Sequence, residues 1–156
     1  MTEKIVTTKI AVCSYIELTE EQKKLIDMAR EATKNSYAPY SNYHVGAALM
    51  LDNGVCITGA NQENASFPAG ICGERAAIFT AGAQYPGEPV KILAITAEYR
   101  RKLVPEPIAP CGVCRQAILE FEKNAPHPIQ IVLGAADSFY VVNSIADLLP
   151  LCFKEF

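Results

Sequence analysis

Apolar and polar positions along the chain change period several times, which predicts a mixture of strands and helices. Residues 4–12 combine β-branched and aliphatic side chains and predict a short strand. Thr19 followed by Gln22 has the sequence of a capping box, which predicts the start of a helix. The apolar face of that helix consists of Leu25, Ile26, Met28, Ala29 and Ala32.

A β-hairpin is the clearest local motif. Residues 45–51 and 55–58 are strand-like, and the turn Asp52-Asn53-Gly54 lies between them. Residues 90–97 predict a strand that is buried on both faces. Two further strands, 129–133 and 139–142, are separated by a loop short enough for an antiparallel return.

Helices are predicted after each of two cysteine motifs. The first runs from Cys72 to about Gly82, and the second opens at Pro110, because proline is favoured in the first turn of a helix. Both motifs therefore fall at helix N-termini, where free N–H groups and the helix dipole stabilise thiolates. Ser144 caps a last short helix that ends at Pro150. Strands that alternate with helices predict an α/β sheet with helices on both faces.

Composition and charge narrow the class of protein. The chain has 156 residues and a net charge of −3, which fits one globular domain without a basic face for polynucleotide. A small substrate is therefore expected. No apolar run approaches the ~18 residues of a membrane span, and the N-terminus does not resemble a secretory signal. These features predict a cytoplasmic protein, in which six cysteines serve as metal ligands and core residues rather than disulfides.

The two cysteine motifs together predict a catalytic zinc site. Cys72 lies two residues before Glu74, and Cys111 and Cys114 follow Pro110. Three thiolates leave one zinc position open, as in catalytic sites, whereas structural sites use four protein ligands. Cys111 and Cys114 alone would also fit half a zinc ribbon, two core cysteines or a redox motif. Cys-x-Glu combined with Pro-Cys-x-x-Cys is instead the signature of zinc-dependent nucleobase deaminases.

The expected chemistry follows from this ligand set. Zinc lowers the pKa of a bound water from about 15.7 toward 7. Glu74 would take the proton of that water, deliver it to ring N3 and later hand a proton to the departing amine; the alternative role for Glu74 is helix capping. Arg75 is expected to hydrogen-bond a ligand sulfur and draw charge from it, although a surface ion pair is an alternative.

Six separated motifs resemble the small homotetrameric cytidine deaminases of pyrimidine salvage. They occur in the same order from about Leu18 nearly to the C-terminus: Ser36-Tyr37-Ala38-Pro39-Tyr40-Ser41, Val45-Gly46-Ala47-Ala48-Leu49, Asn61-Gln62-Glu63-Asn64-Ala65-Ser66, Ile71-Cys72-Gly73-Glu74-Arg75, Pro110-Cys111-Gly112-Val113-Cys114-Arg115-Gln116 and Leu148-Leu149-Pro150. The resemblance implies a three-layer α/β/α sandwich with a mixed five-stranded sheet. It also implies one Zn²⁺ per chain and a homotetramer with shared active sites. Residues 19–156 would form the deaminase domain, with residues 1–18 as an extension.

The resemblance also implies residues that bind substrate. Asn61 and Glu63 match a loop whose amide and carboxylate hold the ribose hydroxyls. Gly73 stands where the family usually has alanine, and its backbone N–H would contact the base carbonyl, so this substitution is expected to matter little. Tyr43 replaces a phenylalanine beside the pyrimidine. Phe153 matches an aromatic residue that stacks on the base in the site of a neighbouring subunit.

Three functions compete, two of them enzymatic and the third from another class. The first is hydrolytic deamination of cytidine and 2′-deoxycytidine to the uridines. The second is deamination of a modified cytosine nucleoside or nucleoside antibiotic, but such enzymes usually lack the loop that Asn61 and Glu63 match. The third is a structural zinc module without turnover, which would require a fourth protein ligand that the spacing does not supply.

Overall fold

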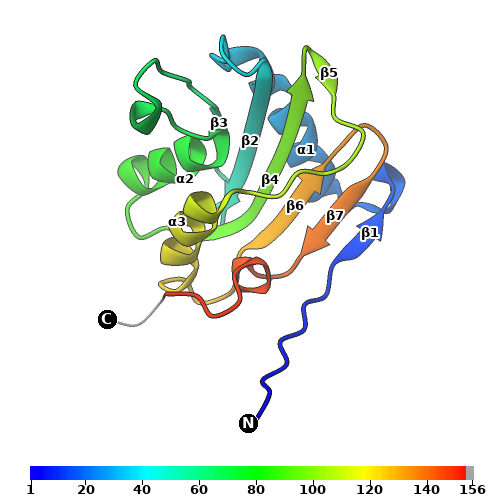
Figure 1. The fold of residues 1–156 in the computed structure, drawn as a ribbon, viewed down its shortest axis with the longest axis vertical. Coiled ribbons are helices and arrows are strands. Elements are labelled where there is room, and N and C mark those ends of the chain that lie inside the picture. The colour runs from blue at the N-terminus through cyan, green and yellow to red at the C-terminus, as the bar shows by residue number, and fades with distance from the viewer. Residues whose placement is uncertain (154–156) are drawn as a thin grey trace.

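The computed structural model describes residues 1–153 and contains one mixed β-sheet between two layers of helices (Figure 1). The sheet order is β1-β7-β6-β4-β2-β3, and β5 pairs with β4. The strands are β1 Ala11–Cys13, β2 Tyr43–Leu51, β3 Cys56–Ala60, β4 Val90–Tyr99, β5 Lys102–Leu103, β6 Gln130–Gly134 and β7 Phe139–Val142. The expected α/β/α architecture is confirmed, but the sheet has seven strands rather than five because the short β1 and β5 extend it.

Three α-helices cover the sheet, and helices occur on both faces as predicted. Helix α1 lies on one face, and α2 and α3 lie side by side on the other (Figure 1). The helices are α1 Glu20–Ala32, α2 Gly73–Gln84 and α3 Gly112–Glu122, and single 3₁₀ turns are η1 Tyr15–Glu17, η2 Thr33–Asn35, η3 Phe67–Ala69 and η4 Ile145–Leu148. None of the helices within residues 1–153 has the length and apolar character that crossing a membrane requires.

Strand β4 forms the centre of the sheet. It pairs antiparallel with β2 and parallel with β6, and β6 returns antiparallel into β7. Residues 92–97 of β4 are all buried, which confirms the prediction of a strand covered on both faces. The predicted hairpin is also confirmed, because β2 and β3 pair antiparallel across the turn at Asp52-Asn53-Gly54.

The alternation of side chains in the strands separates two apolar cores. In β2, Ala47 and Leu49 face the core beneath α2 and α3, whereas Ala48 and Met50 face α1. All four side chains are buried, so this strand contributes to both cores. Helix α1 begins with the predicted capping box, in which Thr19 Oγ1 accepts from Gln22 N at 3.3 Å and Gln22 Oε1 accepts from Thr19 N at 2.8 Å.

The N-terminal strand is much shorter than the sequence pattern predicts. Only Ala11–Cys13 joins the sheet, and residues 1–12 are exposed. Its partner β7 spans four residues, and Phe139 to Val141 pair with β1. Because β7 ends at Val142, residues 4–9 have no strand to pair with among residues 1–153.

Helix α2 lies unusually close to β3, and a glycine makes this approach possible. A Cβ on Gly59 would lie 2.4 Å from both Ala77 N and Gly73 O, so any larger residue would push the helix outward. This contact fixes the first turn of α2, which carries Cys72, Glu74 and Arg75, against the sheet.

Candidate metal centre and substrate pocket

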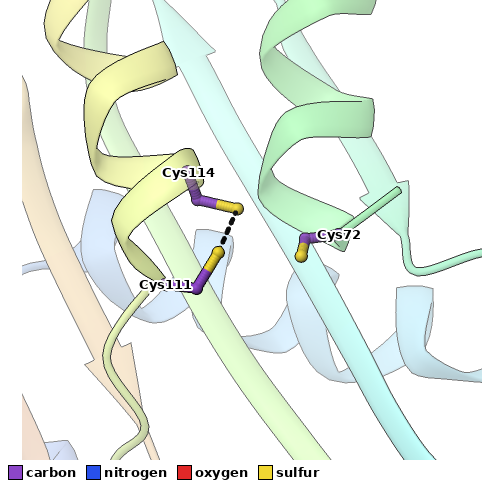
Figure 2. A group of neighbouring side chains, drawn as sticks. All are labelled: Cys72, Cys111 and Cys114. Carbon is purple, nitrogen blue, oxygen red and sulfur yellow. Dashed lines mark hydrogen bonds between the residues drawn. The ribbon is translucent and has the colours of Figure 1, made fainter. Parts of the chain in front are cut away.

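Three cysteine sulfurs from two helix N-termini meet at one point. The Sγ atoms of Cys72, Cys111 and Cys114 all lie within 4.8 Å of one another. Figure 2 shows that Cys72 approaches from the start of α2, and Cys111 and Cys114 approach from the first turn of α3. Cys111 Sγ lies 3.4 Å from Cys114 Sγ. Residues 39 positions apart in the sequence are thus brought within coordinating distance of a single ion.

The two outer cysteines are the N-cap residues of their helices. Cys72 and Cys111 have extended backbone conformations, and their carbonyls accept the first intrahelical bonds, from Ala76 N at 3.0 Å and Arg115 N at 2.9 Å. Neither side chain caps its helix, so both sulfurs remain available to bind a metal ion. Pro110 consequently precedes the N-cap, and the prediction that it opens α3 in the first turn is wrong by two residues.

The electrostatic environment favours a thiolate at Cys72. A hydrogen bond with the Cys114 thiol lowers the pKa of Cys72 to about 5, against the opposing effect of burial and with help from Arg75. The same hydrogen bond and burial raise the pKa of Cys114. Cys72 therefore favours the thiolate and Cys114 the thiol, and a metal ion must displace the Cys114 proton because metal ligands bind as thiolates.

Glu74 supplies a buried carboxyl group next to the cluster. It is the second residue of α2 and is 3 % exposed, and its Oε2 has no hydrogen-bond partner among residues 1–153. Burial raises the pKa of this carboxyl group. A buried polar atom without a partner costs free energy, so its presence beside three sulfurs indicates a functional role.

The observed groups fit the metal that the sequence predicted. Thiolate ligands at this spacing suit zinc, and the cluster contains three sulfurs but no His, Asp or Glu ligand from residues 1–153. Arg75 Nη2 lies 3.9 Å from Cys72 Sγ, in hydrogen-bond contact with the sulfur as expected. The guanidinium therefore partly balances the negative charge of the thiolates.

A cavity of about 520 Å³ leads to the cluster and also contains the predicted ribose loop. Its wall includes Cys72 and Arg75 on one side and Asn61 and Glu63 on the other. The remaining lining residues are Tyr40, Ser41, Gln62, Asn64, Phe67, Gly70 and Ile71. The fold thus joins the cysteine cluster and the polar loop in one pocket.

The polar loop is held rigidly by its own side chains. Asn61 Oδ1 accepts from Val45 N at 2.8 Å, and Asn61 Nδ2 donates to Tyr43 O at 2.8 Å. The carboxylate of Glu63 accepts from Tyr40 N at 2.9 Å and from the hydroxyl and the N–H of Ser41. The hydrogen bond from the Ser41 hydroxyl is the main cause that lowers the pKa of Glu63. Glu63 therefore carries its charge at neutral pH.

Three other predicted residues do not line the cavity. Tyr43 is half-buried at the start of β2, with its ring 6.2 Å from the ring of Tyr99, and it does not line the cavity. Phe153 is 65 % exposed beyond η4, and its carbonyl accepts from Gln116 Nε2 at 2.7 Å. Gly73 is buried as the first residue of α2. An added Cβ there would lie 2.9 Å from Val45 O, so alanine requires a local shift, in contrast to the expectation that it matters little.

Sequence reasoning missed several residues that shape the site. Ser41 fixes Glu63, and Tyr40 and Phe67 form an edge-to-face pair at the cavity wall, with ring centroids 6.2 Å apart. Arg115 donates to Pro110 O at 2.7 Å and to Leu148 O at 2.5 Å, which ties the Cys111 loop to the C-terminal segment. Tyr40, Ser41 and Arg115 lie inside motifs quoted above, but their roles depend on contacts between distant segments.

Sequence comparisons match this chain to a deaminase family model and to cytidine deaminases. A family model described as the cytidine and deoxycytidylate deaminase zinc-binding region matches residues 19–126. A cytidine deaminase from Halalkalibacterium halodurans is 36 % identical over 133 residues, which cover 85 % of this chain and 94 % of that protein. A probable cytidine deaminase from Dictyostelium discoideum is 32 % identical over 136 residues, which cover 87 % of this chain and 86 % of that protein.

Solved structures agree with these sequence matches. The crystal structure of cytidine deaminase from Burkholderia pseudomallei superposes with a TM-score of 0.71 at 40 % identity, covering 87 % of this chain and 100 % of that chain. Cytidine deaminase from Mycobacterium tuberculosis superposes with a TM-score of 0.67 at 30 % identity, covering 85 % of this chain and 96 % of that chain.

Proposed function

This chain belongs to the cytidine and deoxycytidylate deaminase zinc-binding family, and we propose that it hydrolyses cytidine and 2′-deoxycytidine to uridine and 2′-deoxyuridine with release of ammonia. One observation carries the proposal. The three-sulfur cluster adjoins the buried carboxyl of Glu74, and its member Cys72 lines the same cavity as Asn61 and Glu63. That arrangement places a metal-binding site, a group that can carry protons and polar groups for a sugar next to one another.

Cys72, Cys111 and Cys114 would hold one zinc ion per chain. When bound, zinc supplies Lewis acidity that makes water a nucleophile at neutral pH. The positive ends of α2 and α3 and the guanidinium of Arg75 offset the negative charge of the three thiolates. This compensation matters because three thiolates donate more negative charge than neutral imidazoles would.

Glu74 would move the protons of the reaction. Its carboxylate accepts one proton from the attacking water and delivers it to N3 of the pyrimidine. It then takes the remaining proton from the oxygen that the water added at C4 and passes it to the departing amino group. Burial raises the pKa of Glu74, and a carboxyl whose pKa lies closer to neutrality both accepts and releases protons more readily. The carboxylate is restored when ammonia leaves.

Asn61 and Glu63 would bind the ribose despite their internal hydrogen bonds. A carboxylate offers about four lone-pair positions, so Glu63 can accept from a sugar hydroxyl in addition to Tyr40 and Ser41. The second N–H of the Asn61 amide is likewise left after its bond to Tyr43 O. The internal bonds hold both groups in place before substrate arrives, which lowers the entropic cost of binding.

The remaining assignments concern the base and the assembly. The Gly73 N–H would contact the base carbonyl. Tyr43 would border the pyrimidine from the start of β2, beyond the part of the cavity that Asn61 and Glu63 line. Phe153 would stack on the base in a neighbouring protomer, which fits its exposed position on one chain. We propose a homotetramer, because Phe79 and Val113 are exposed beside an apolar depression on α2 and α3.

The proposal includes a domain division and a location. Residues 19–156 would form the deaminase domain. Residues 1–18 would form an extension, of which Ala11–Cys13 join the edge of the sheet as β1. We infer a cytoplasmic location because none of the six cysteines is paired in a disulfide, as is usual in a reducing compartment.

The test uses purified, zinc-loaded protein. Loss of ultraviolet absorbance and release of ammonia are followed with cytidine, 2′-deoxycytidine and a panel of modified cytosine nucleosides and nucleotides. Turnover of cytidine or 2′-deoxycytidine supports the proposal. Turnover of a modified nucleoside alone would assign a different substrate, and no turnover by fully zinc-loaded protein would refute the enzymatic function.

A further inference from the structure

A second cavity, of about 450 Å³, lies next to the β4–β5 turn and shares no lining residue with the nucleoside pocket. Its wall includes Ser36, Tyr37, His44, Arg100 and Arg101. No carboxylate lines it. This cavity is called the Arg100–His44 cleft below.

The two arginines occupy a strained turn. Tyr99 pairs with Lys102, so Arg100 and Arg101 are the central residues of a two-residue hairpin loop. Their φ angles are 50° and 64°. A loop with positive φ at both central residues strongly favours Asn-Gly, because side chains such as arginine are disfavoured there. Strain of this kind persists at functional sites, where the side chains are needed.

Neither arginine forms an ion pair with a residue that the structure describes. Among residues 1–153, the ion pairs involve neither Arg100 nor Arg101. Arg101 Nη1 donates to Thr33 O at 3.1 Å, and the guanidinium of Arg100 lies 5.2 Å from the ring centroid of Tyr99. Because each guanidinium has five N–H donors, most of their hydrogen-bonding capacity remains for a ligand.

His44 also lines the cleft, and its Nδ1 contacts the hydroxyl oxygen of Ser36. Ser36 Oγ lies 2.5 Å from Thr33 O, so its single proton is donated to that carbonyl. The contact of 2.6 Å between Ser36 Oγ and His44 Nδ1 is then made by an Nδ1–H donor. Nε2 of His44 makes no hydrogen bond among residues 1–153, so it is left as a hydrogen-bonding group for a ligand in the cleft.

We propose that the Arg100–His44 cleft binds a phosphate group, either free or as the 5′-phosphate of a nucleotide. Two guanidiniums and an imidazole match the several oxygens of a tetrahedral dianion. Tyr37, which is 56 % exposed at the same wall, presents a ring on which a nucleotide base can stack. Binding here does not require the deaminase reaction, so it is independent of the proposed function.

The cleft adjoins the nucleoside pocket through one shared segment. Tyr37 N donates to Asn61 O at 2.9 Å, and Glu63 N donates to Tyr37 O at 2.8 Å. The backbone of Tyr37 therefore belongs to the wall of the cleft and also holds the loop that carries Asn61 and Glu63. A phosphate ligand would contact the segment that supports the ribose-binding residues.

Isothermal titration of the full chain in low-salt buffer tests the proposal, with inorganic phosphate and AMP as probes. AMP is chosen because its adenine does not fit the expected cytosine chemistry of the metal site. We expect saturable binding of at least one probe. Tighter binding of AMP identifies a nucleotide as the source of the phosphate, and equal affinities identify free phosphate.

The double variant Arg100→Asn/Arg101→Gly should bind at least about tenfold more weakly while its melting temperature stays the same or rises, because Asn-Gly relieves the strained turn. Arg100→Gln/Arg101→Gln removes the same charges without changing the turn and should lose binding equally. The control variant Lys4→Ala/Lys24→Ala removes two exposed charges outside the cleft and should bind normally. No binding by wild-type protein at millimolar probe, unchanged binding in both arginine variants, or an equal loss in the control would overturn the proposal.

Discussion

The side-chain oxygen of Asn61 accepts a hydrogen bond from the backbone N–H of Val45 at 2.8 Å. The same amide donates to Tyr43 O, so one side chain completes the backbone hydrogen bonding at the start of β2. A residue expected to touch the ribose is thus also a structural link between the pocket loop and the sheet.

Replacement of Asn61 is therefore expected to affect stability as well as substrate binding. Asn61→Ala removes two side-chain hydrogen bonds and leaves two backbone groups unsatisfied, which should lower the free energy of unfolding by about 1–3 kcal/mol. Urea denaturation measures this loss. Asn64→Ala is the matched control, because Asn64 makes one local bond, to Ser66 N at 2.8 Å on the surface, and should cost less than about 1 kcal/mol. Equal stability of Asn61→Ala and wild type would contradict the structural role.

Metal binding should depend on the cysteines of the cluster alone. Cys72→Ser is expected to reduce zinc below one ion per chain, because it removes a thiolate whose sulfur lies within 4.8 Å of the other two. Cys56→Ser should keep full zinc content, since Cys56 lies on β3 outside the cluster. Metal analysis by mass spectrometry measures both variants.

Zinc removal should also lower thermal stability. Chelation removes a ligand that binds the folded state, and a ligand at 1,000 times its dissociation constant contributes about 4 kcal/mol. The melting temperature of wild-type protein should fall with chelator and recover with added zinc, whereas that of Cys72→Ser should respond much less. A melting temperature of wild type that does not change with zinc would contradict the site.

Glu74→Ala should separate catalysis from metal binding. We expect one zinc per chain but a fall in kcat of at least about 100-fold, because a general acid–base group contributes roughly 10²- to 10⁴-fold. The variant should be no less stable than wild type, since the lost carboxyl is buried with an unpartnered oxygen. Activity near the wild-type level would show that Glu74 is only a first-turn helix residue.

Arg75→Ala tests whether the guanidinium tunes the thiolates. Its contact of 3.9 Å with Cys72 Sγ draws charge from the sulfur, and loss of that contact should move the acidic limb of the pH–rate profile to higher pH. Arg75→Lys keeps the positive charge and should retain more of the wild-type profile. The pH dependence of kcat/KM is measured for both variants together with zinc content. Identical profiles and zinc affinities for wild type and Arg75→Ala would leave the tuning role without support.

The contact between His127 and Asp52 predicts a pH-dependent contribution to stability. His127 Nε2 lies 2.9 Å from both Asp52 oxygens, and this hydrogen bond raises the pKa of His127 in the folded state. The stabilisation is therefore fully present below the unfolded pKa of about 6.5 and is lost as pH rises through the folded pKa. Because both side chains are 36 % exposed, it should amount to less than about 1 kcal/mol.

Urea unfolding at pH 5.5 and 8.5 checks this contribution. Wild-type protein should lose more stability between the two pH values than His127→Gln does. The same pH dependence in both proteins would assign the effect to other groups.

Local sequence patterns predicted the elements well where each element could be recognised within a few residues. The Thr19–Gln22 capping box, the β2–β3 hairpin and the buried strand β4 are all confirmed. Residues 4–12 were predicted as a strand on propensity alone, and only Ala11–Cys13 pairs, because the length of β7 limits the pairing. Propensity describes what a segment can form, whereas pairing requires a partner of matching length.

The sequence by itself determined the ligand types, their positions at helix starts and the pairing of Cys72 with Glu74, because covalent spacing and helix geometry are local properties. Only the tertiary structure decided that α2 and α3 lie side by side, which brings Cys72 within 4.8 Å of Cys111 and Cys114. It also decided that Asn61 and Glu63 share a cavity with Cys72, and that Arg100, Arg101 and His44 line a second cavity. These distances depend on how the two apolar cores pack the helices and loops around the sheet, and contacts between distant segments leave no periodic signal in the chain.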